Sequence, residues 1–199
     1  MNPVGSDVSR GKESEAGRRE HVLDAALLIF ARYGYRKASM DDIARAAGIS
    51  RPGLYFHFAS KQDLFRAAVT RALDGDVAAA ERALSETGRP LRDRLVEAFD
   101  HWTGRYIGPM TQDIALVIES NPDLLEPMAG EYATRFAGLV TDALTAGVPV
   151  NRGGVASDVA QTLLSTAMGI KHEVSSREEF LVRMTVGVGL LLLALERAP

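Results

Sequence analysis

The sequence contains no cysteine, so disulfide bonds and thiolate metal sites are excluded. It also lacks a long apolar run. The longest is VGVGLLLLAL at Val186–Leu195, about half of the ~20 residues that a membrane-spanning helix needs. Residues 1–20 are polar and charged and contain no apolar segment of the kind found in signal peptides. We therefore expect a cytoplasmic protein that does not bind a membrane.

Sequence motifs of common enzyme classes are also missing. The chain has no phosphate-binding G-x-x-x-x-G-K-[ST], no G-x-G-x-x-G after a predicted strand, no G-x-S-x-G and no H-E-x-x-H. The four histidines are far apart in the sequence, which disfavours a histidine metal site: His21, His57, His101 and His172. These absences predict a protein that is not an enzyme and that uses no cofactor and no metal ion.

The formal net charge of −3 is small, but the charges are unevenly distributed. Residues 1–72 hold 12 Lys and Arg against 8 Asp and Glu, whereas residues 73–199 hold 11 against 18. A basic N-terminal third followed by an acidic remainder suggests that the two parts have different partners. A split of this size also arises by chance, so it carries weight only together with a motif.

Apolar residues recur at helical spacing, and no strand-length alternation of apolar and polar residues occurs. With capping residues at Ser39, Ser50 and Ser60 and with Gly or Pro breaks, this predicts an all-α protein. The expected helices lie near 18–33, 40–47, just after Ser50, and at 61–86, 90–106, 111–120, 122–146, 154–173 and 176–197. Residues 1–17 have mixed charges and little apolar content, which predicts a disordered arm.

The segment SMDDIARAAGISRPGLYFHF, residues 39–58, predicts two short helices joined by the turn Gly48-Ile49-Ser50. A turn of this length, with a glycine that can adopt a positive φ, is typical of a helix-turn-helix motif. Ile43 and Leu54 are expected to pack between the helices. Arg51 and Tyr55, four residues apart, then share the opposite face, which suits base edges or phosphates of a DNA major groove.

His57 and Lys61 follow at the end of the second helix and the start of the next. A helix N-terminus and an ammonium group together can hold a phosphate at that point. The phenylalanines of this region, Phe56, Phe58 and Phe65, are expected in the core rather than in the groove. A glycine turn between two helices is common in itself, so the surrounding residues decide the interpretation.

Those residues resemble the DNA-binding domain of the TetR family of bacterial transcriptional regulators. The likeness runs through AALLIFARYGYRKASMDDIARAAGISRPGLYFHFASKQDLF and covers about a quarter of the chain. It implies a helix-turn-helix DNA-binding domain at 18–66, joined by a long helix to an effector-binding and dimerisation domain at 67–199. Beyond the first domain no motif can be matched, because that part of the family diverges widely.

The resemblance also implies roles for single residues. In the family, base edges are met by positions that match Arg51, Pro52, Gly53 and Tyr55. Phosphates are usually held by positions that match Ser39, Tyr55, His57 and Lys61. Pro52 has no N–H and can offer only an apolar contact, for instance to a thymine methyl. Phe56 stands where many relatives carry a second tyrosine, so one phosphate hydrogen bond made in those relatives is absent here.

The last two predicted helices, within residues 154–197, are apolar over more than one face and must be covered by something. They can form the monomer core or a homodimer interface, and the resemblance favours the dimer. Gly187 and Gly189 would then let a partner helix approach closely. Two copies of the motif also suit a palindromic operator, which a two-fold dimer can read.

Aromatic, methionine and polar side chains between about 95 and 170 are candidates for contact with a small molecule, because family members bind ligands within this helical bundle. Each is by itself more typical of a core, but together they favour a flat or hydrophobic effector: His101, Trp102, Tyr106, Met110, Glu119, Met128, Tyr132, Phe136 and Met168. We therefore predict a ligand-responsive regulator, acting as a repressor, that binds operator DNA as a dimer. The alternatives are a helical binding or scaffold protein that has lost DNA binding, and a helical enzyme.

Overall fold

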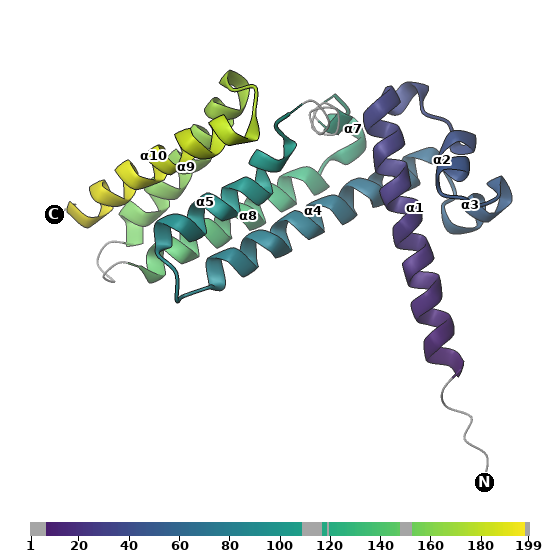
Figure 1. Ribbon diagram of the computed structural model, residues 1–199, viewed down its shortest axis with the longest axis horizontal. Coiled ribbons are helices and arrows are strands. Elements are labelled where there is room, and N and C mark those ends of the chain that lie inside the picture. Colours follow the sequence, from purple (N-terminus) through teal and green to yellow (C-terminus); the bar gives the residue numbers. More distant parts are fainter. Residues whose placement is uncertain (1–6, 109–116, 119, 148–152, 198–199) are drawn as a thin grey trace, which may run out of the picture. The chain divides into compact units, whose positions relative to one another are not determined.

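The computed structural model describes residues 7–108, 117–118, 120–147 and 153–197 (Figure 1). All regular structure among these residues is helical, which confirms the all-α prediction. The helices are α1 (Asp7–Lys37), α2 (Met40–Ala46), α3 (Arg51–His57), α4 (Lys61–Ser85), α5 (Leu91–Trp102), the 3-10 turn η1 (Gly104–Tyr106), α7 (Pro122–Leu125), α8 (Met128–Ala146), α9 (Gly153–Glu173) and α10 (Arg177–Arg197).

The chain divides into two compact units. Unit 1 comprises residues 1–71 and 113–125, and unit 2 comprises residues 72–112 and 126–199. The boundary between them lies inside α4, so this one helix contributes residues to both units. Unit 1 contains the whole segment in which the sequence predicts a helix-turn-helix.

Serine side chains begin three consecutive helices of unit 1. The Oγ of Ser39 accepts a hydrogen bond from the backbone N–H of Asp42, and those of Ser50 and Ser60 accept from the N–H groups three residues on, each at 3.1 Å. Each serine satisfies a donor that the helix itself leaves unpaired. The three predicted helix starts are therefore confirmed.

An aromatic cluster forms the core of unit 1. Phe30 of α1 and Phe65 of α4 are fully buried, with their ring centroids 5.0 Å apart in an edge-to-face arrangement. Tyr35 lies 4.9 Å from Phe65, and Phe58 is also buried. Such ring pairs contribute about 0.5–1.5 kcal/mol beyond their burial, so this cluster holds α1 and α4 together.

A larger apolar core fills unit 2. It combines Phe99 of α5, Phe136 of α8, Leu163 of α9 and Phe180 of α10 with Leu84 near the end of α4. In Figure 1, α9 and α10 lie side by side, and α10 also packs against α5. α8 also packs against α9, so these helices form one bundle around the core.

The first helix begins earlier than the sequence predicts. α1 begins at Asp7, so residues 7–17 are helical where we expected a disordered arm. Extending an existing helix adds one hydrogen bond per residue without a new nucleation cost, which offsets the low apolar content of this segment. At its other end, Gly34 has φ 75° and ψ 157° and interrupts α1 at the position where the sequence predicts the helix to end.

Two predicted helices are divided in the structure. The helix expected at 90–106 ends at Trp102 and continues only as η1. Gly104, the first residue of η1, packs so closely that a Cβ there would lie 2.5 Å from an oxygen of Asp100. The helix expected at 122–146 is split into α7 and α8 by Pro127, whose missing N–H and ring are incompatible with a helix interior. Most of the helix expected at 111–120 lies outside the described residues.

Candidate functional site

The turn between α2 and α3 has the geometry of a helix-turn-helix. Gly48 adopts φ +63°, a conformation that side chains with a Cβ rarely take. Ile43 of α2 and Leu54 of α3 are fully buried, and Ala47 is almost so. These small and apolar contacts fix the angle between the two helices and leave the remaining residues of α3 at the surface.

Four of the seven residues of α3 are well exposed, namely Arg51, Pro52, Tyr55 and Phe56. The guanidinium of Arg51 lies 5.7 Å from the centroid of the Tyr55 ring. Its Nη1 also donates to Asp41 Oδ2 on α2 at 3.2 Å. Exposed ion pairs of this kind are weak, so Arg51 can leave Asp41 for a base edge or a phosphate at little cost.

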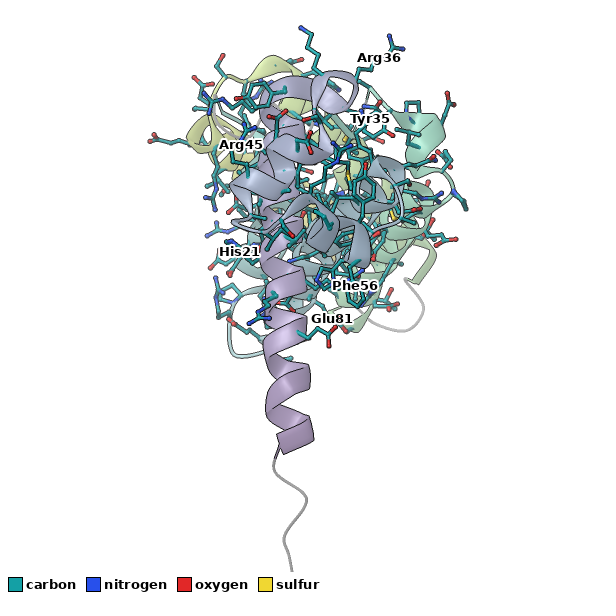
Figure 2. All side chains as sticks on the ribbon, turned by 90° about the vertical axis from the view of Figure 1, so that its right-hand side faces the viewer. His21, Tyr35, Arg36, Arg45, Phe56 and Glu81 are labelled. Carbon is teal, nitrogen blue, oxygen red and sulfur yellow. The ribbon has the colours of Figure 1, made fainter. Side chains whose placement is uncertain are left out.

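Phe56 differs from the prediction, which placed it in the core. Its side chain is 80% exposed, whereas Phe58 and Phe65 are buried as predicted. Because α3 is short and buries only Leu54, a residue two positions after Leu54 points away from the unit. Figure 2 looks onto the side of the molecule that carries Phe56.

Two of the four residues expected to hold phosphates, Ser39 and Lys61, are already hydrogen-bonded within unit 1. Ser39 caps α2 and also donates from its Oγ to Asp42 Oδ2 at 2.5 Å. The ammonium of Lys61 donates to the carbonyl oxygens of Tyr35 at 3.0 Å, Ala38 at 3.2 Å and Arg36 at 3.4 Å. An ammonium has three N–H donors, so Lys61 can still contribute its charge to DNA but has few donors left for a phosphate. His57 is half-buried at the last turn of α3, and Gly53 is half-buried in its first turn.

Only some of the residues predicted to contact an effector lie together. Trp102 stacks on Phe136, with ring centroids 4.8 Å apart and planes inclined by 12°, and Phe136 is fully buried. His101 lies 3.9 Å from a carboxylate oxygen of Glu97. Met168 is 46% exposed on α9 and lies outside the core cluster to which Trp102 and Phe136 belong. Met110 and Glu119 lie outside the described residues.

A second feature of this region is a buried carboxylate in α4, for which the sequence predicted no role. Asp76 is fully buried and accepts hydrogen bonds from the hydroxyl of Tyr106 and from Nη1 of Arg105, both in η1. Burial raises the pKa of Asp76, although Tyr106 and Arg105 oppose the shift. Burial and the neighbouring carboxylate also raise the pKa of Tyr106. The hydroxyl of Tyr106, a residue predicted to contact the effector, therefore holds η1 to α4.

Tyr132 of α8 makes a similar contact with Asp74, two residues before Asp76 on α4. Its hydroxyl donates to Asp74, and burial together with this hydrogen bond raises the pKa of Tyr132 to about 12. The acidic DGD segment at 74–76 was the only sequence signal for these contacts. A carboxylate on an otherwise apolar helix face predicts a partner, but the partner's position in the sequence cannot be read from the helix itself.

None of the described helices is long and apolar enough to cross a membrane. Among the same residues, no three His, Asp or Glu side chains are grouped so that they can hold a metal ion.

Residues 22–68 match the family described as "Bacterial regulatory proteins, tetR family". An HTH-type transcriptional repressor from Mycobacterium tuberculosis is 31% identical over 169 residues, which are 82% of this chain and 86% of that protein. The HTH-type transcriptional activator FasR from Mycolicibacterium smegmatis is 34% identical over 145 residues, 71% of this chain, and the chain spans only 64% of FasR.

A solved structure extends the likeness over the fold. It is a regulator from Mesorhizobium loti assigned to the TetR family, with a TM-score of 0.72 and 22% identity, covering 90% of this chain and 96% of that one. The helix-turn-helix geometry, the match at 22–68 and the 31% identity that extends through both units agree. The chain belongs to the TetR family of bacterial transcriptional regulators.

Proposed function

We propose that this chain is a repressor that binds a palindromic operator as a homodimer and leaves it when a small molecule binds to unit 2. The observation that carries the proposal is α3, which buries only Leu54 and presents Arg51, Pro52 and Tyr55 to solvent. An arginine and a tyrosine on a short exposed helix after a tight turn suit base edges and phosphates of the major groove. We propose repression rather than activation because the chain covers 86% of the Mycobacterium tuberculosis repressor but only 64% of the activator FasR.

Arg51→Ala tests the DNA-binding face. Against the duplex that the protein itself enriches from a random pool, the substitution is expected to cost about 1–3 kcal/mol and to relax sequence preference at one position per half-site. Arg32→Ala is the matched control, because Arg32 is an exposed arginine on α1 of the same unit. Equal affinities for both variants at matched salt would show that α3 does not read DNA. Absence of salt-dependent retention on any duplex would favour a binding or scaffold protein instead.

The proposed dimer interface is an apolar stripe on α10. Val182, Val186, Leu190 and Leu193 follow helical spacing and are 48–63% exposed. Leu190 and Gly189 also line a groove of about 510 Å³. Gly187 has a different role from the one predicted, because its Cα faces Thr166 of α9 in the same chain. A second copy that covers the stripe would remove this apolar surface from water.

Leu190→Glu tests this interface. Because Leu190 is exposed in the single chain, a carboxylate there should leave the fold intact but be buried and unpaired in a dimer. We expect a folded monomer in sedimentation experiments, with loss of specific operator binding. Thr145→Glu adds the same charge to an exposed position of α8 and should leave the dimer unchanged. A normal dimer for Leu190→Glu would place the interface elsewhere.

The proposed effector is flat or hydrophobic. Trp102 is half-buried and stacks on Phe136, so an apolar molecule beside it would extend an existing stack. Solved structures with this fold have been obtained with choline, for a regulator from Saccharomonospora viridis, and with stearoyl-CoA, for FadR from Bacillus subtilis. The fold accommodates ligands of different chemistry, so the effector class has to come from this chain's own residues.

The single tryptophan provides a direct test of the effector proposal. Titration with 8-anilinonaphthalene-1-sulfonate, a flat apolar probe, should quench the fluorescence of Trp102 and weaken operator binding. α4 begins in unit 1 and ends in unit 2, so we propose that it carries the coupling. Linkage requires that operator DNA weaken probe binding by the same factor. A probe that binds equally well with and without operator would contradict this coupling.

A further inference from the structure

Phe56 is the most exposed large apolar side chain among the described residues. It is 80% exposed, ahead of Leu28 at 65% and Leu190 at 63%. Its ring meets the neighbouring His57 edge-on at 5.3 Å, and no described residue distant in the sequence stacks on it. A phenylalanine left in water contributes little to the folded state, so its ring is available for contact with a partner.

Phe56 belongs to an apolar strip on α3. Pro52 lies four residues earlier, on the same side of the helix, and is also exposed. This strip is adjacent to the one formed by Arg51 and Tyr55, because successive residues of a helix are about 100° apart. The short helix therefore presents a polar strip and an apolar strip next to each other.

The charge around this strip indicates which partner covers it. Arg51 is exposed on α3, and Arg45, labelled in Figure 2, is exposed at the end of α2. Each pairs with an exposed carboxylate, Asp41 and Asp42 respectively, and such weak pairs can be exchanged for an anionic partner. A polyanion is therefore favoured over a second apolar helix or a neutral surface. Within the major groove, the apolar group available to a phenyl ring is the C5-methyl of thymine.

We propose that Phe56 is a sequence-reading residue, whose ring contacts the C5-methyl group of one thymine in each operator half-site. This inference rests on the proposed operator binding and adds a specificity to it. A tyrosine at this position would place a hydroxyl at the end of the same ring, and such a group can donate to a phosphate. Phenylalanine has no donor, so it can discriminate only through apolar contact. The apolar strip then selects thymine while Arg51 and Tyr55 select polar base edges or phosphates.

The test replaces single thymines by deoxyuridine in the duplex enriched from a random pool by the intact protein. Deoxyuridine keeps the base pair and removes only the methyl group. For the unmodified protein, one thymine per half-site should lose about fourfold in affinity, and the symmetric double replacement about fifteenfold, the factors that correspond to burial of one and two methyl groups. For Phe56→Ala, the same replacement should have no further effect.

Two variants serve as controls. Leu28→Ala removes an exposed apolar side chain from α1 of the same unit and should retain the full deoxyuridine effect. Pro52→Ala should also retain it at the thymine assigned to Phe56. Thermal unfolding of Phe56→Ala should match that of the unmodified protein, because the ring is 80% exposed and stacks on no distant residue of the described part of the chain.

The remaining outcomes separate the two proposals. If no duplex is enriched, operator binding itself fails. If operator binding holds but deoxyuridine weakens Phe56→Ala as much as the unmodified protein, or has no effect on either, the inference about Phe56 is overturned. The inference is equally overturned if only Pro52→Ala abolishes the deoxyuridine effect, or if Phe56→Ala weakens binding to every duplex by the same factor.

Discussion

The side-chain hydrogen bonds of units 1 and 2 differ in reach and burial. In unit 1, Ser39, Ser50 and Ser60 bond to groups three residues away, at partly or fully exposed positions. In unit 2, Asp76 and Tyr106 are 30 residues apart, and Asp100 and Arg177 are 77 apart, with both carboxylates buried. Short-range caps build small helices whose outer faces stay available to a partner. Long-range buried pairs join helices to one another.

Unit 1 also has long-range side-chain contacts, made by Lys61 and by Arg71, whose Nε donates to Asp24 Oδ1 at 2.9 Å across 47 residues. The ammonium of Lys61 reaches carbonyl groups 23–26 residues earlier and lies 4.6 Å from the centroid of the Tyr35 ring. This contact fixes the start of α4 to the end of α1, close to the helices that carry the candidate DNA face. Unit 1 thus combines a surface of exchangeable polar groups with long-range contacts at Lys61 and Arg71.

The largest expected loss of stability comes from breaking the ion pair between α5 and α10. Arg177 Nε donates to Asp100 Oδ1 at 2.7 Å, and Asp100 is only 7% exposed. Arg177→Ala leaves a buried carboxylate unpaired and should lower the free energy of unfolding by about 3 kcal/mol. The comparison in unit 1 is Arg51→Ala, which breaks an exposed pair with Asp41 and should cost less than about 1 kcal/mol. Urea unfolding of both variants measures the contrast, and equal losses would contradict it.

The next largest effect is expected for Lys61, whose ammonium holds the start of α4 to the end of α1. Lys61→Met keeps most of the apolar stem and removes the hydrogen bonds to Tyr35, Arg36 and Ala38. We expect a loss of about 1–2 kcal/mol in the free energy of unfolding. Because the ammonium is occupied by carbonyls, the salt dependence of operator binding should fall by less than about one unit per half-site. If the salt slope instead falls by one full unit per half-site and the free energy of unfolding is unchanged, Lys61 holds a phosphate directly.

Replacement of two glycines by alanine should change the free energy of unfolding in opposite directions. Gly48 has φ +63°, so Gly48→Ala should cost about 1 kcal/mol although no atom lies within 4 Å of the added methyl. Gly75 is exposed in α4 with equally open surroundings, so Gly75→Ala should gain about 0.5–1 kcal/mol. Thermal unfolding measures both. The same sign for both substitutions would show that the turn does not depend on the positive φ of Gly48.

The smallest expected effect is the pH response of Asp76. Burial raises its pKa in the folded state above the ordinary 3.8, so the folded chain binds more protons than the unfolded chain between these two values. The free energy of unfolding should therefore decrease as pH rises through this interval. Asp76→Asn cannot ionise and should lack this decrease, and at neutral pH it should be no less stable than the unmodified protein. Asp74→Asn, at an exposed position of α4, is the control. A lower stability of Asp76→Asn at neutral pH would show that the ion pair with Arg105 outweighs burial.

Local signals predicted the elements of unit 1 well and those of unit 2 less well. The serine caps and Gly48 specify α2, the turn and α3 within a few residues, because each acts on its own backbone. Phe56 was misplaced because apolar character alone does not say which face of a seven-residue helix is buried. The division at Pro127 was readable from the sequence and was outweighed by the apolar periodicity around it.

The sequence by itself determined the all-α class, the helix-turn-helix, the polar face of α3 and the family. These depend on spacing within a few residues, where the chain's own geometry sets which groups meet. Tertiary structure alone decided that Lys61 bonds to the end of α1, that Tyr106 and Arg105 donate hydrogen bonds to Asp76, and that Phe56 faces solvent. Those outcomes depend on which distant helices pack together. A charged or aromatic side chain has many possible partners along the chain, and only the packed fold selects one by excluding water from the others.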